Sequence, residues 1–260
     1  CLETLMFEVY AVATPGLEEL ALRELETLGA GSCQPEDGGI SFQASFELLC
    51  QLNLQSRICS RFIVRLGEEK ITSLKALQQF ANKLSWKEFI RSNQPIQVRA
   101  TCKQSKIYHS GAVIERFQNA LHASVGKGLE YVKGEDLPPY TQRIIVRIFN
   151  NVVTVSIDSS GEHLHKRGYR FATAKAPMRE NIAAGCIASI GYTGAQPFLD
   201  PMTGSGTLAI EAAMIAINRA PGLLREFSFM QWPMFRPKKW QALLEHTRQQ
   251  ERPATAPVIA

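Results

Sequence analysis

Residues 198–208 constrain the fold of this chain more than any other segment. Their sequence, FLDPMTGSGTL, runs from a short apolar strand through Asp200 into a glycine-rich turn, and then into an apolar helix predicted over 207–218. Glycines let a backbone approach a ligand closely, and the first turn of the following helix offers unpaired N–H groups. Residues 257–260 are predicted to open one more strand. Strand, glycine turn, helix and strand predict the start of a doubly wound α/β sheet.

Composition and length suit an ordinary globular protein. The chain has 260 residues, of which 45% are hydrophobic and 20% are charged, enough for one large domain or two to three small ones. Disordered, collagen-like and coiled-coil chains are therefore excluded. The longest apolar runs, such as residues 209–217, are interrupted by Glu211 and are too short to span a bilayer. Because no signal peptide opens the chain either, we expect no membrane partner.

The cysteines indicate a reducing compartment. Six are scattered along the chain, at positions 1, 33, 50, 59, 102 and 186, with no CxxC pair. Cys50, Cys59 and Cys186 lie in apolar segments, which predicts reduced core thiols in a cytoplasmic protein rather than a disulfide framework or a zinc site. The chain begins at Cys1 rather than at Met, so we expect a fragment of a longer protein.

The net charge of +5 is unevenly distributed. In residues 1–60 nine acidic side chains are balanced only by Arg23 and Arg57, so this segment carries −7 and residues 61–260 carry +12. A basic region behind an acidic leader favours a polyanion as partner. A solvated, slightly basic surface is the plainer alternative.

Hydrophobic periodicity and turn residues predict three blocks of elements. The first is a β-α-β-β-α-β pattern over residues 1–66, with strands at 7–13, 31–35, 39–43 and 58–66 and helices at 17–28 and after an N-cap at Ser45. The second has helices at 73–82 and 110–125, a strand at 96–102, and strands at 143–149 and 152–157 joined as a hairpin by Asn150-Asn151. The third has helices at 178–190, 207–218 and 238–250, a strand at 196–199, and an aromatic, Pro-bearing loop at 227–237.

Three cofactor classes use a glycine turn of this kind. A nucleoside triphosphate is disfavoured because a P-loop needs a Lys beside its last glycine, and none lies near Gly206. Gly204-x-Gly206-x-x-Ala209 resembles the dinucleotide fingerprint, but that site also needs an acidic residue at the end of a second strand about twenty residues on. The residues around Glu226 form an aromatic loop instead. The third class is S-adenosylmethionine, whose amino-acid end sits by the acidic residue and the glycine turn.

The stretch DPMTGSGTLAIEAA resembles the cofactor motif of the THUMP-domain bacterial 23S rRNA guanine-N2 methyltransferase family, which reads LDPxCGSGTLLIEAA. Further pieces resemble the same family in the same order and cover essentially the whole chain. They are ATPGLEEL at 13–20, DSSGEHLHKRGYR at 158–170, APMRENIAA at 176–184 and RAPG at 219–222.

The resemblance implies an α+β N-terminal part followed by a truncated α/β Rossmann-like methyltransferase domain. The implied segments are a ferredoxin-like segment at 1–60, a THUMP RNA-binding domain at 61–158, a linker at 159–175 and the start of the methyltransferase domain at 176–260. The cofactor it implies is S-adenosylmethionine, held by Asp200, Pro201, Thr203, Gly204, Ser205, Gly206 and Thr207 and flanked by Pro177 and Glu180. The chain departs from the family at Met202-Thr203, where a Cys is common at the second position. Because Thr is small and polar, we expect the pocket to survive.

Two basic stretches are candidates for RNA contact, and the THUMP resemblance strengthens the first. The expected residues are Lys103, Lys106, Tyr108 and His109 in the first stretch, and Lys166, Arg167 and Arg170 in the second. A solvated loop with an N-cap at Ser110 is the alternative for the first stretch, and structural salt bridges are the alternative for the second. His163 and His165 have no Cys partner, so no metal site is expected.

The [DN]-P-P-[YF] motif of amino-methyltransferases, whose acid or amide accepts hydrogen bonds from the target amino group, is expected beyond Ala260. Residues 136–140, DLPPY, resemble it, but the inserted Leu spoils the spacing, so we interpret them as a loop. The acid that binds the cofactor ribose is also expected past Ala260. The 260 residues are therefore expected to contain no catalytic residue, to be inactive in methyl transfer and to bind the cofactor weakly.

The sequence thus predicts part of an S-adenosylmethionine-dependent enzyme that methylates guanine N2 in structured RNA, most specifically 23S rRNA, with the base flipped out of its stack. Two alternatives stay open. One is a DNA adenine-N6 methylase, which shares the cofactor fold but has no need of a THUMP-like leader. The other is a non-enzymatic RNA-binding module with a degenerate cofactor fold.

Overall fold

The chain forms two compact units, each assembled from segments that are distant in sequence. The computed structural model describes residues 5–126, 128–170 and 177–260. The first unit comprises Cys1–Phe62, Glu162–Glu226 and Arg236–Ala260, and the second comprises Ile63–Gly161 and Phe227–Phe235. Among the described residues, no helix is both long and apolar enough to cross a membrane.

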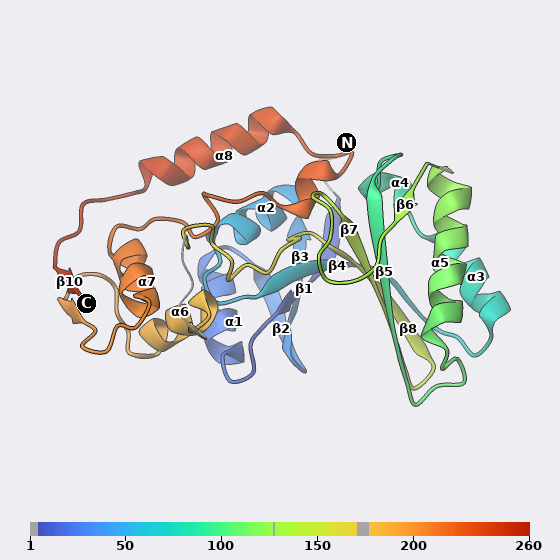
Figure 1. The fold of residues 1–260 in the computed structure, drawn as a ribbon, viewed down its shortest axis with the longest axis horizontal. Coiled ribbons are helices and arrows are strands. Elements are labelled where there is room, and N and C mark those ends of the chain that lie inside the picture. Colours follow the sequence, from blue (N-terminus) through green and yellow to red (C-terminus); the bar gives the residue numbers. More distant parts are fainter. Residues whose placement is uncertain (1–4, 127, 171–176) are drawn as a thin grey trace. The chain divides into compact units, whose positions relative to one another are not determined.

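The first unit opens with the predicted β-α-β-β-α-β order (Figure 1). Its elements are β1 (Met6–Val12), α1 (Glu18–Thr27), β2 (Gly31–Glu36), β3 (Gly39–Ser45) and α2 (Phe46–Gln55), and β4 (Arg61–Lys70) then leads into the second unit. β3 pairs antiparallel with both β1 and β2. Buried and exposed side chains alternate along β1, with Val9 and Ala11 fully buried, as a half-buried strand requires. The predicted N-cap is confirmed, because the Ser45 hydroxyl accepts the Leu48 N–H at 3.1 Å.

The rest of the first unit contains the glycine turn. Its elements are α6 (Glu180–Ser189), β9 (Phe198–Leu199), α7 (Thr207–Ala216), α8 (Pro237–Gln249) and β10 (Val258–Ile259). β10 pairs parallel with β9, Val258 opposite Phe198 and Ile259 opposite Leu199. This parallel pair with α7 between its strands is the predicted beginning of a doubly wound sheet. Helix α6 packs closely on the N-terminal segment, since a Cβ on Gly185 would lie 2.7 Å from a Leu17 methyl carbon.

The second unit is a sheet with helices on one face (Figure 1). Its strand order is β4-β8-β7-β5-β6, where the strands are β5 (Pro95–Lys103), β6 (Glu130–Tyr131), β7 (Gln142–Phe149) and β8 (Val152–Asp158) together with β4. β5 pairs parallel with β6 and β7, and β8 pairs antiparallel with β7 and β4. The helices are α3 (Leu74–Lys83), α4 (Trp86–Phe89) and α5 (Ser110–Val125). The sequence did not predict the two short elements α4 and β6.

A segment from between α7 and α8 also belongs to the second unit. Residues 227–235, which include the short 3₁₀ helix η2 (Ser228–Gln231), were predicted only as a loop. Phe229 and Trp232 are fully buried there. The indole Nε1–H of Trp232 donates to Gln142 Oε1 at 2.8 Å, and the Trp232 ring meets Phe89 edge-on with centroids 4.9 Å apart. The aromatic residues of this loop therefore form part of the hydrophobic core of the second unit.

The predicted burial of three cysteines holds for two of them. Cys50 and Cys59 are buried free thiols, and burial raises the pKa of both, so they stay protonated. The prediction was wrong for Cys186, which is exposed. It lies on α6, where Ala183 and Ile187 form the buried face. An apolar helix sequence did not reveal which of its faces packs.

Candidate functional site

Asp200 stands at the end of β9, directly before the glycine turn. Its backbone N–H donates to the Ile259 carbonyl at 2.9 Å, and its Oδ1 accepts the Met202 N–H at 3.2 Å. The residue is only 8% exposed, and its Oδ2 is buried with no hydrogen-bond partner among the described residues. Buried carboxylate oxygens are rarely left unpaired. This oxygen is therefore suited to accept a hydrogen bond from a ligand.

The glycine turn brings backbone and small polar groups to the same place. Gly204 and Gly206 have φ of +55° and +76°, a left-handed conformation that strains other residues. Gly206 is the N-cap residue of α7, so the unpaired N–H groups of that helix open onto the turn. The Thr203 hydroxyl is another buried group without a partner among the described residues. Pro201 is exposed beside it.

Arg170 connects the two helices that begin at this site. Its Nε donates to Glu180 Oε1 at 3.0 Å, and its Nη2 lies 2.9 Å from the same oxygen. Nη2 also donates to the Thr207 hydroxyl at 3.0 Å, and Nη1 contacts the Ser205 hydroxyl at 3.4 Å. Glu180 is the first residue of α6 and Thr207 the first of α7. The structure thus brings Arg170, predicted as an RNA contact, together with three predicted cofactor residues. Pro177, the other predicted flanking residue, is half-buried just before α6.

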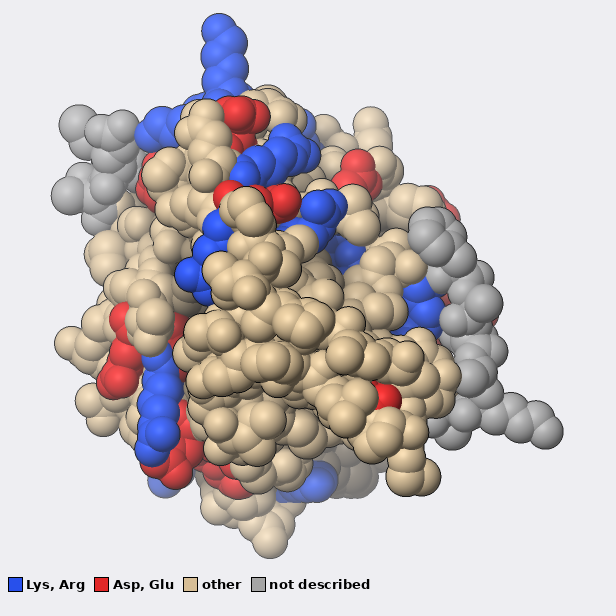
Figure 2. All heavy atoms as spheres, turned by 90° about the vertical axis from the view of Figure 1, so that its left-hand side faces the viewer, with Lys and Arg blue, Asp and Glu red and all other residues tan. Residues whose placement is uncertain are grey.

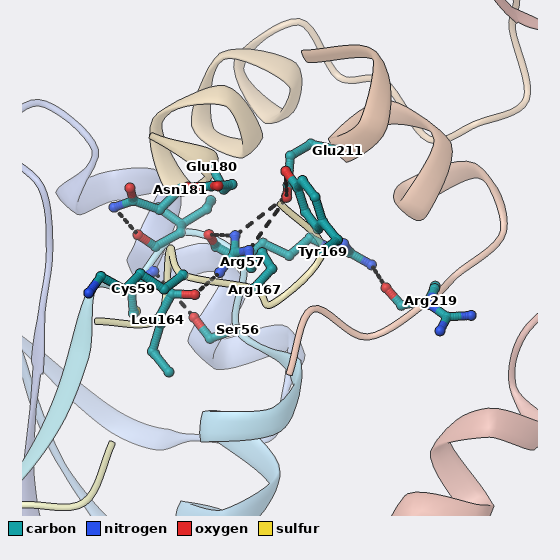
Figure 3. Close-up of polar contacts among 12 residues, drawn as sticks. Ser56, Arg57, Cys59, Leu164, Arg167, Tyr169, Glu180, Asn181, Glu211 and Arg219 are labelled. Atoms are coloured by element: carbon teal, nitrogen blue, oxygen red, sulfur yellow. Dashed lines mark hydrogen bonds and ion pairs between the residues drawn. The ribbon is translucent and has the colours of Figure 1, made fainter. Parts of the chain in front are cut away.

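Arg167 does not fit its predicted role as an RNA contact, because its side chain is 2% exposed. It pairs with the fully buried Glu211 of α7, with Nη2 3.4 Å from Oε2 and Nε 3.5 Å from Oε1 (Figure 3). Its other donors reach the Leu164 and Arg57 carbonyls. A phosphate cannot reach a guanidinium that is already enclosed, so the alternative, a structural salt bridge, is the one observed.

Tyr169 joins the same buried cluster (Figure 3). Its hydroxyl donates to Glu211 Oε1 at 3.1 Å. Burial, together with the nearby Glu211 carboxylate, raises the Tyr169 pKa far above its usual range, so the phenol remains a donor at any physiological pH. Arg57 lies at the same cluster, with an Nη2 that donates to the Arg219 carbonyl at 2.7 Å. Burial lowers the Arg57 pKa.

Asn181, which the sequence did not single out, links α6 to the N-terminal segment. Its amide Nδ2 donates to the Thr14 hydroxyl at 2.8 Å and lies 3.4 Å from the Ile58 carbonyl oxygen. Asn181 is almost fully buried, next to the buried Glu180. The signal in the sequence is a pair of polar residues at the start of an otherwise largely apolar helix.

Lys166 and two histidines belong to the same basic stretch as Arg167 and Arg170. Lys166 is exposed and pairs with Glu162 four residues earlier. The rings of His163 and His165 stack with centroids 5.4 Å apart. Burial, and then the positive charges around it, lower the His165 pKa to about 4. Across the described ranges, no group of three or more His, Cys, Asp or Glu side chains is arranged to hold a metal ion.

In the second unit, the first predicted RNA stretch forms the loop between β5 and α5. Tyr108 is 71% exposed, and its ring lies 4.3 Å from that of His109. Lys103 and Lys106 are exposed as well. The loop is fixed to the β7–β8 hairpin, since the Lys106 N–H donates to Asn151 Oδ1 at 2.8 Å. Lys103 is the last residue of β5, and Lys106, Tyr108 and His109 follow it in the loop, so the four predicted residues are close together in sequence.

The strands next to this loop add residues that the sequence analysis missed. Lys103 lies opposite Phe149, and Thr101 lies opposite Arg147, in the parallel β5–β7 register. Arg147 and Phe149 are exposed, and the Arg147 guanidinium carbon lies 5.6 Å from the Phe149 ring centroid. Buried Ile144, Val146 and Ile148 alternate with them. The period-two pattern of RIIVRIF was the signal that placed both side chains on the open face.

Figure 2 views the first unit from the side of α7 and β10. A broad surface in the middle of this face has few charged side chains, and Lys and Arg gather toward the edge where α8 lies. The exposed apolar residues of the unit include Leu199 and Ile259 on the two parallel strands and Met202 in the turn, the last 90% exposed. The glycine turn is therefore open to solvent.

Two domain families match the chain. Residues 8–63 match the RlmL ferredoxin-like domain, and residues 167–260 match the RMKL-like methyltransferase domain. The chain thus contains a ferredoxin-like N-terminal domain and a mixed α/β, Rossmann-like methyltransferase fold, which confirms the predicted fold class.

One curated relative and two solved structures show the similarity over most of the chain. A protein of Synechocystis sp. (strain ATCC 27184 / PCC 6803 / Kazusa), named "Putative RNA methyltransferase slr0064", is 33% identical over 244 residues, which cover 94% of this chain and 64% of that protein. A crystal structure from Listeria monocytogenes str. 4b F2365, described as a predicted N6-adenine-specific DNA methylase, matches with a TM-score of 0.86 at 28% identity and covers 98% of this chain and 68% of that one. SMU.472, described as a putative methyltransferase complexed with SAH, matches with a TM-score of 0.82 at 29% identity. The match covers 95% of this chain and 65% of that one. The chain therefore spans about two thirds of the length of these relatives.

Proposed function

We propose that this chain is part of an S-adenosylmethionine-dependent RNA methyltransferase. The observation that carries the proposal is the buried Oδ2 of Asp200 beside the glycine turn, which has no hydrogen-bond partner within the part of the chain that the structure describes. An acceptor in this position suits the ammonium group of the amino-acid end of S-adenosylmethionine. The SAH complex of SMU.472, at 29% identity, and the match of residues 167–260 to a methyltransferase domain support the choice of cofactor.

The residues present fit this cofactor. Asp200 would accept its ammonium N–H, and the backbone of Gly204 and Gly206 leaves room for a close approach. Ser205, Thr207 and the buried Thr203 hydroxyl supply further hydrogen-bonding groups, with Pro201, Pro177 and Glu180 at the rim. When bound, the cofactor supplies an activated methyl group. This chain's own contribution is to hold the cofactor's amino-acid end in one orientation, which lowers the entropic cost of the transfer.

RNA is the proposed substrate, and the second unit is proposed to bind it as a THUMP domain over residues 61–158. Residues 159–175 are the proposed link to a methyltransferase domain that begins at 176. Lys103, Lys106, Tyr108 and His109 combine exposed cations with an exposed ring, the pairing that binds single-stranded bases and phosphates. Arg147 and Phe149 continue that surface. The name of the Synechocystis relative supports RNA. The finer proposal, guanine N2 in 23S rRNA of the cytoplasm, rests on the motif resemblance.

A binding experiment tests the cofactor step. Isothermal titration calorimetry of the 260-residue chain should give saturable S-adenosylmethionine binding, and Asp200→Asn should weaken it about tenfold, since one charge-assisted hydrogen bond is lost. Glu245→Gln is the matched control because it makes the same kind of change at an exposed carboxylate of α8. Absence of binding by the unaltered chain would leave the third possibility, an RNA-binding module with a degenerate cofactor fold.

A DNA adenine methylase is the second candidate, favoured by the description of the Listeria structure. The enzyme of which this chain is proposed to be part should be given tritiated S-adenosylmethionine with either rRNA transcripts or duplex DNA, and the labelled nucleoside should be identified. N2-methylguanosine from rRNA supports the proposal. N6-methyladenine from DNA would replace it with the second candidate.

A further inference from the structure

Arg170 occupies an unusual position for a residue expected to bind RNA. Only 18% of its side chain is exposed, and its guanidinium is directed at the start of the glycine-turn helix α7. One edge of the guanidinium, Nε and Nη2, is fully engaged by Glu180 and Thr207. The other nitrogen, Nη1, makes a single long contact of 3.4 Å with the Ser205 hydroxyl. Within the described residues, Nη1 therefore has donor capacity left over at the turn.

The surroundings of Nη1 favour an anionic acceptor. The N-termini of α6 and α7, each ten residues long, begin at Glu180 and Thr207, and helix N-termini carry a partial positive charge. Glu180 balances the charge of Arg170, but it does so on the opposite edge of the guanidinium. A carboxylate at Nη1 would meet a cation and two positive helix ends, with the Ser205 hydroxyl as a further donor.

The turn also offers the complementary group. Asp200, 8% exposed, immediately precedes the turn whose Ser205 and Thr207 contact Arg170, and its buried Oδ2 has no partner among the described residues. A ligand with an ammonium and a carboxylate on one carbon would satisfy both. The amino-acid end of S-adenosylmethionine has this arrangement.

We propose that Arg170 is a specificity residue that binds the carboxylate of the cofactor's amino-acid end through Nη1. This inference rests on the proposed function and adds the residue that distinguishes the intact cofactor from analogues without a carboxylate. Glu180 and Thr207 are the positioning residues that fix the guanidinium. When the ligand binds, its carboxylate replaces the Ser205 hydroxyl as the partner of Nη1. Arg170 then contacts cofactor rather than RNA.

The test compares two ligands on three forms of the 260-residue chain. The ligands are S-adenosylmethionine and decarboxylated S-adenosylmethionine, which keeps the amine, the sulfonium and the adenosine but lacks the carboxylate. The proteins are the unaltered chain, Arg170→Gln and Arg248→Gln, the last a matched control because Arg248 is exposed at the end of α8. Dissociation constants come from calorimetry, and circular dichroism checks that each variant is folded.

The unaltered chain should bind S-adenosylmethionine about ten- to hundredfold more tightly than the decarboxylated analogue. Arg170→Gln should remove that preference, weakening S-adenosylmethionine while leaving the analogue within about twofold. If both ligands weaken together in Arg170→Gln, the arginine only positions the turn and the inference is wrong. If the unaltered chain binds S-adenosylmethionine but does not discriminate, the inference also fails while the proposed function stands.

Failure of the proposed function itself gives a different result, in which the unaltered chain binds neither ligand. Because Arg170→Gln leaves Glu180 without its cation, a second variant, Arg170→Gln with Glu180→Gln, keeps the test valid. The pair has no unbalanced charge, and it too should lose the preference between the ligands.

Discussion

The guanidinium of Arg167 and the carboxylate of Glu211 form an ion pair in the interior of the first unit, with Nη2 3.4 Å from Oε2 and exposures of 2% and 0%. Glu211 lies on α7, one turn beyond the glycine turn, and Arg167 lies just before the segment that leads to α6. Arg167 also donates to carbonyls of Leu164 and Arg57, and Tyr169 donates to Glu211 (Figure 3). The pair therefore fixes α7 against the N-terminal domain.

Removing one partner of this pair should be costly. Glu211→Leu leaves the Arg167 charge buried and unpaired, and we expect a loss of about 3–5 kcal/mol in the free energy of unfolding. The measurement is urea denaturation followed by circular dichroism. The double variant Arg167→Met with Glu211→Leu should recover most of the loss, since two apolar side chains of similar volume need no desolvation. A double variant as unstable as the single one would show that packing, and not charge, dominates at this position.

Local sequence signals predicted local structure well. The β-α-β-β-α-β order, the Ser45 cap and the limits of α5 follow from periodicity and capping residues. Asn150 and Asn151 have φ of +50° and +64°, the left-handed pair that a two-residue hairpin turn demands. The elements missed, α4 and β6, have four and two residues, too few to display a period.

The site depends on contacts that no local pattern contains. Arg167 and Arg170 are three residues apart in one basic run, yet Glu211 encloses the first and Glu180 with Thr207 directs the second to the glycine turn. Their side-chain partners lie up to 44 residues away in sequence, and the Arg57 carbonyl that also accepts from Arg167 lies 110 residues away. A basic stretch predicts cations, and only the tertiary structure determines which of them face solvent.

Gly168, in this same stretch, has a backbone conformation and surroundings that favour glycine. Its φ is +94°, and a Cβ there would lie 2.9 Å from the Leu224 carbonyl oxygen. Gly168→Ala should therefore lower the free energy of unfolding by about 1–3 kcal/mol, because both strain and a backbone clash are introduced. Gly111→Ala is the matched control, since Gly111 lies in α5 and no atom of the described residues comes within 4 Å of the added carbon. The control should be neutral or stabilising by up to about 1 kcal/mol. Equal effects of the two substitutions in urea denaturation would contradict this account.

We expect the stability of the protein to depend on pH because the pKa of His165 is lowered in the folded state. Burial, then His163, Arg179, Arg167 and Lys166, lower its pKa to about 4 from the usual 6.5. The unfolded chain therefore binds more protons between these values, so the free energy of unfolding should rise with pH from about 4 to about 6.5 and fall as the solution is acidified. His165→Gln should reduce the dependence of the thermal unfolding midpoint on pH between these two values. His246→Gln, on the exposed side of α8, should leave the slope of the midpoint against pH unchanged. If His165→Gln also keeps this slope, a group other than His165 causes the pH dependence.

The last prediction concerns RNA binding by the sheet face of the second unit that carries Arg147 and Phe149. Lys106 extends from the β5–α5 loop, and Arg147 lies on β7 beside the exposed Phe149 ring, whereas α3 covers the opposite face (Figure 1). If RNA phosphates contact the open face, Lys106→Ala and Arg147→Ala should each weaken binding of an rRNA transcript and reduce the slope of log affinity against log salt by about one. Lys75→Ala, an exposed cation on α3, is the control and should change neither quantity. Filter binding over a range of salt concentrations measures both. Because counterion release counts each neutralised phosphate, a slope lowered by Lys75→Ala but not by the other two would place the RNA on the helical face.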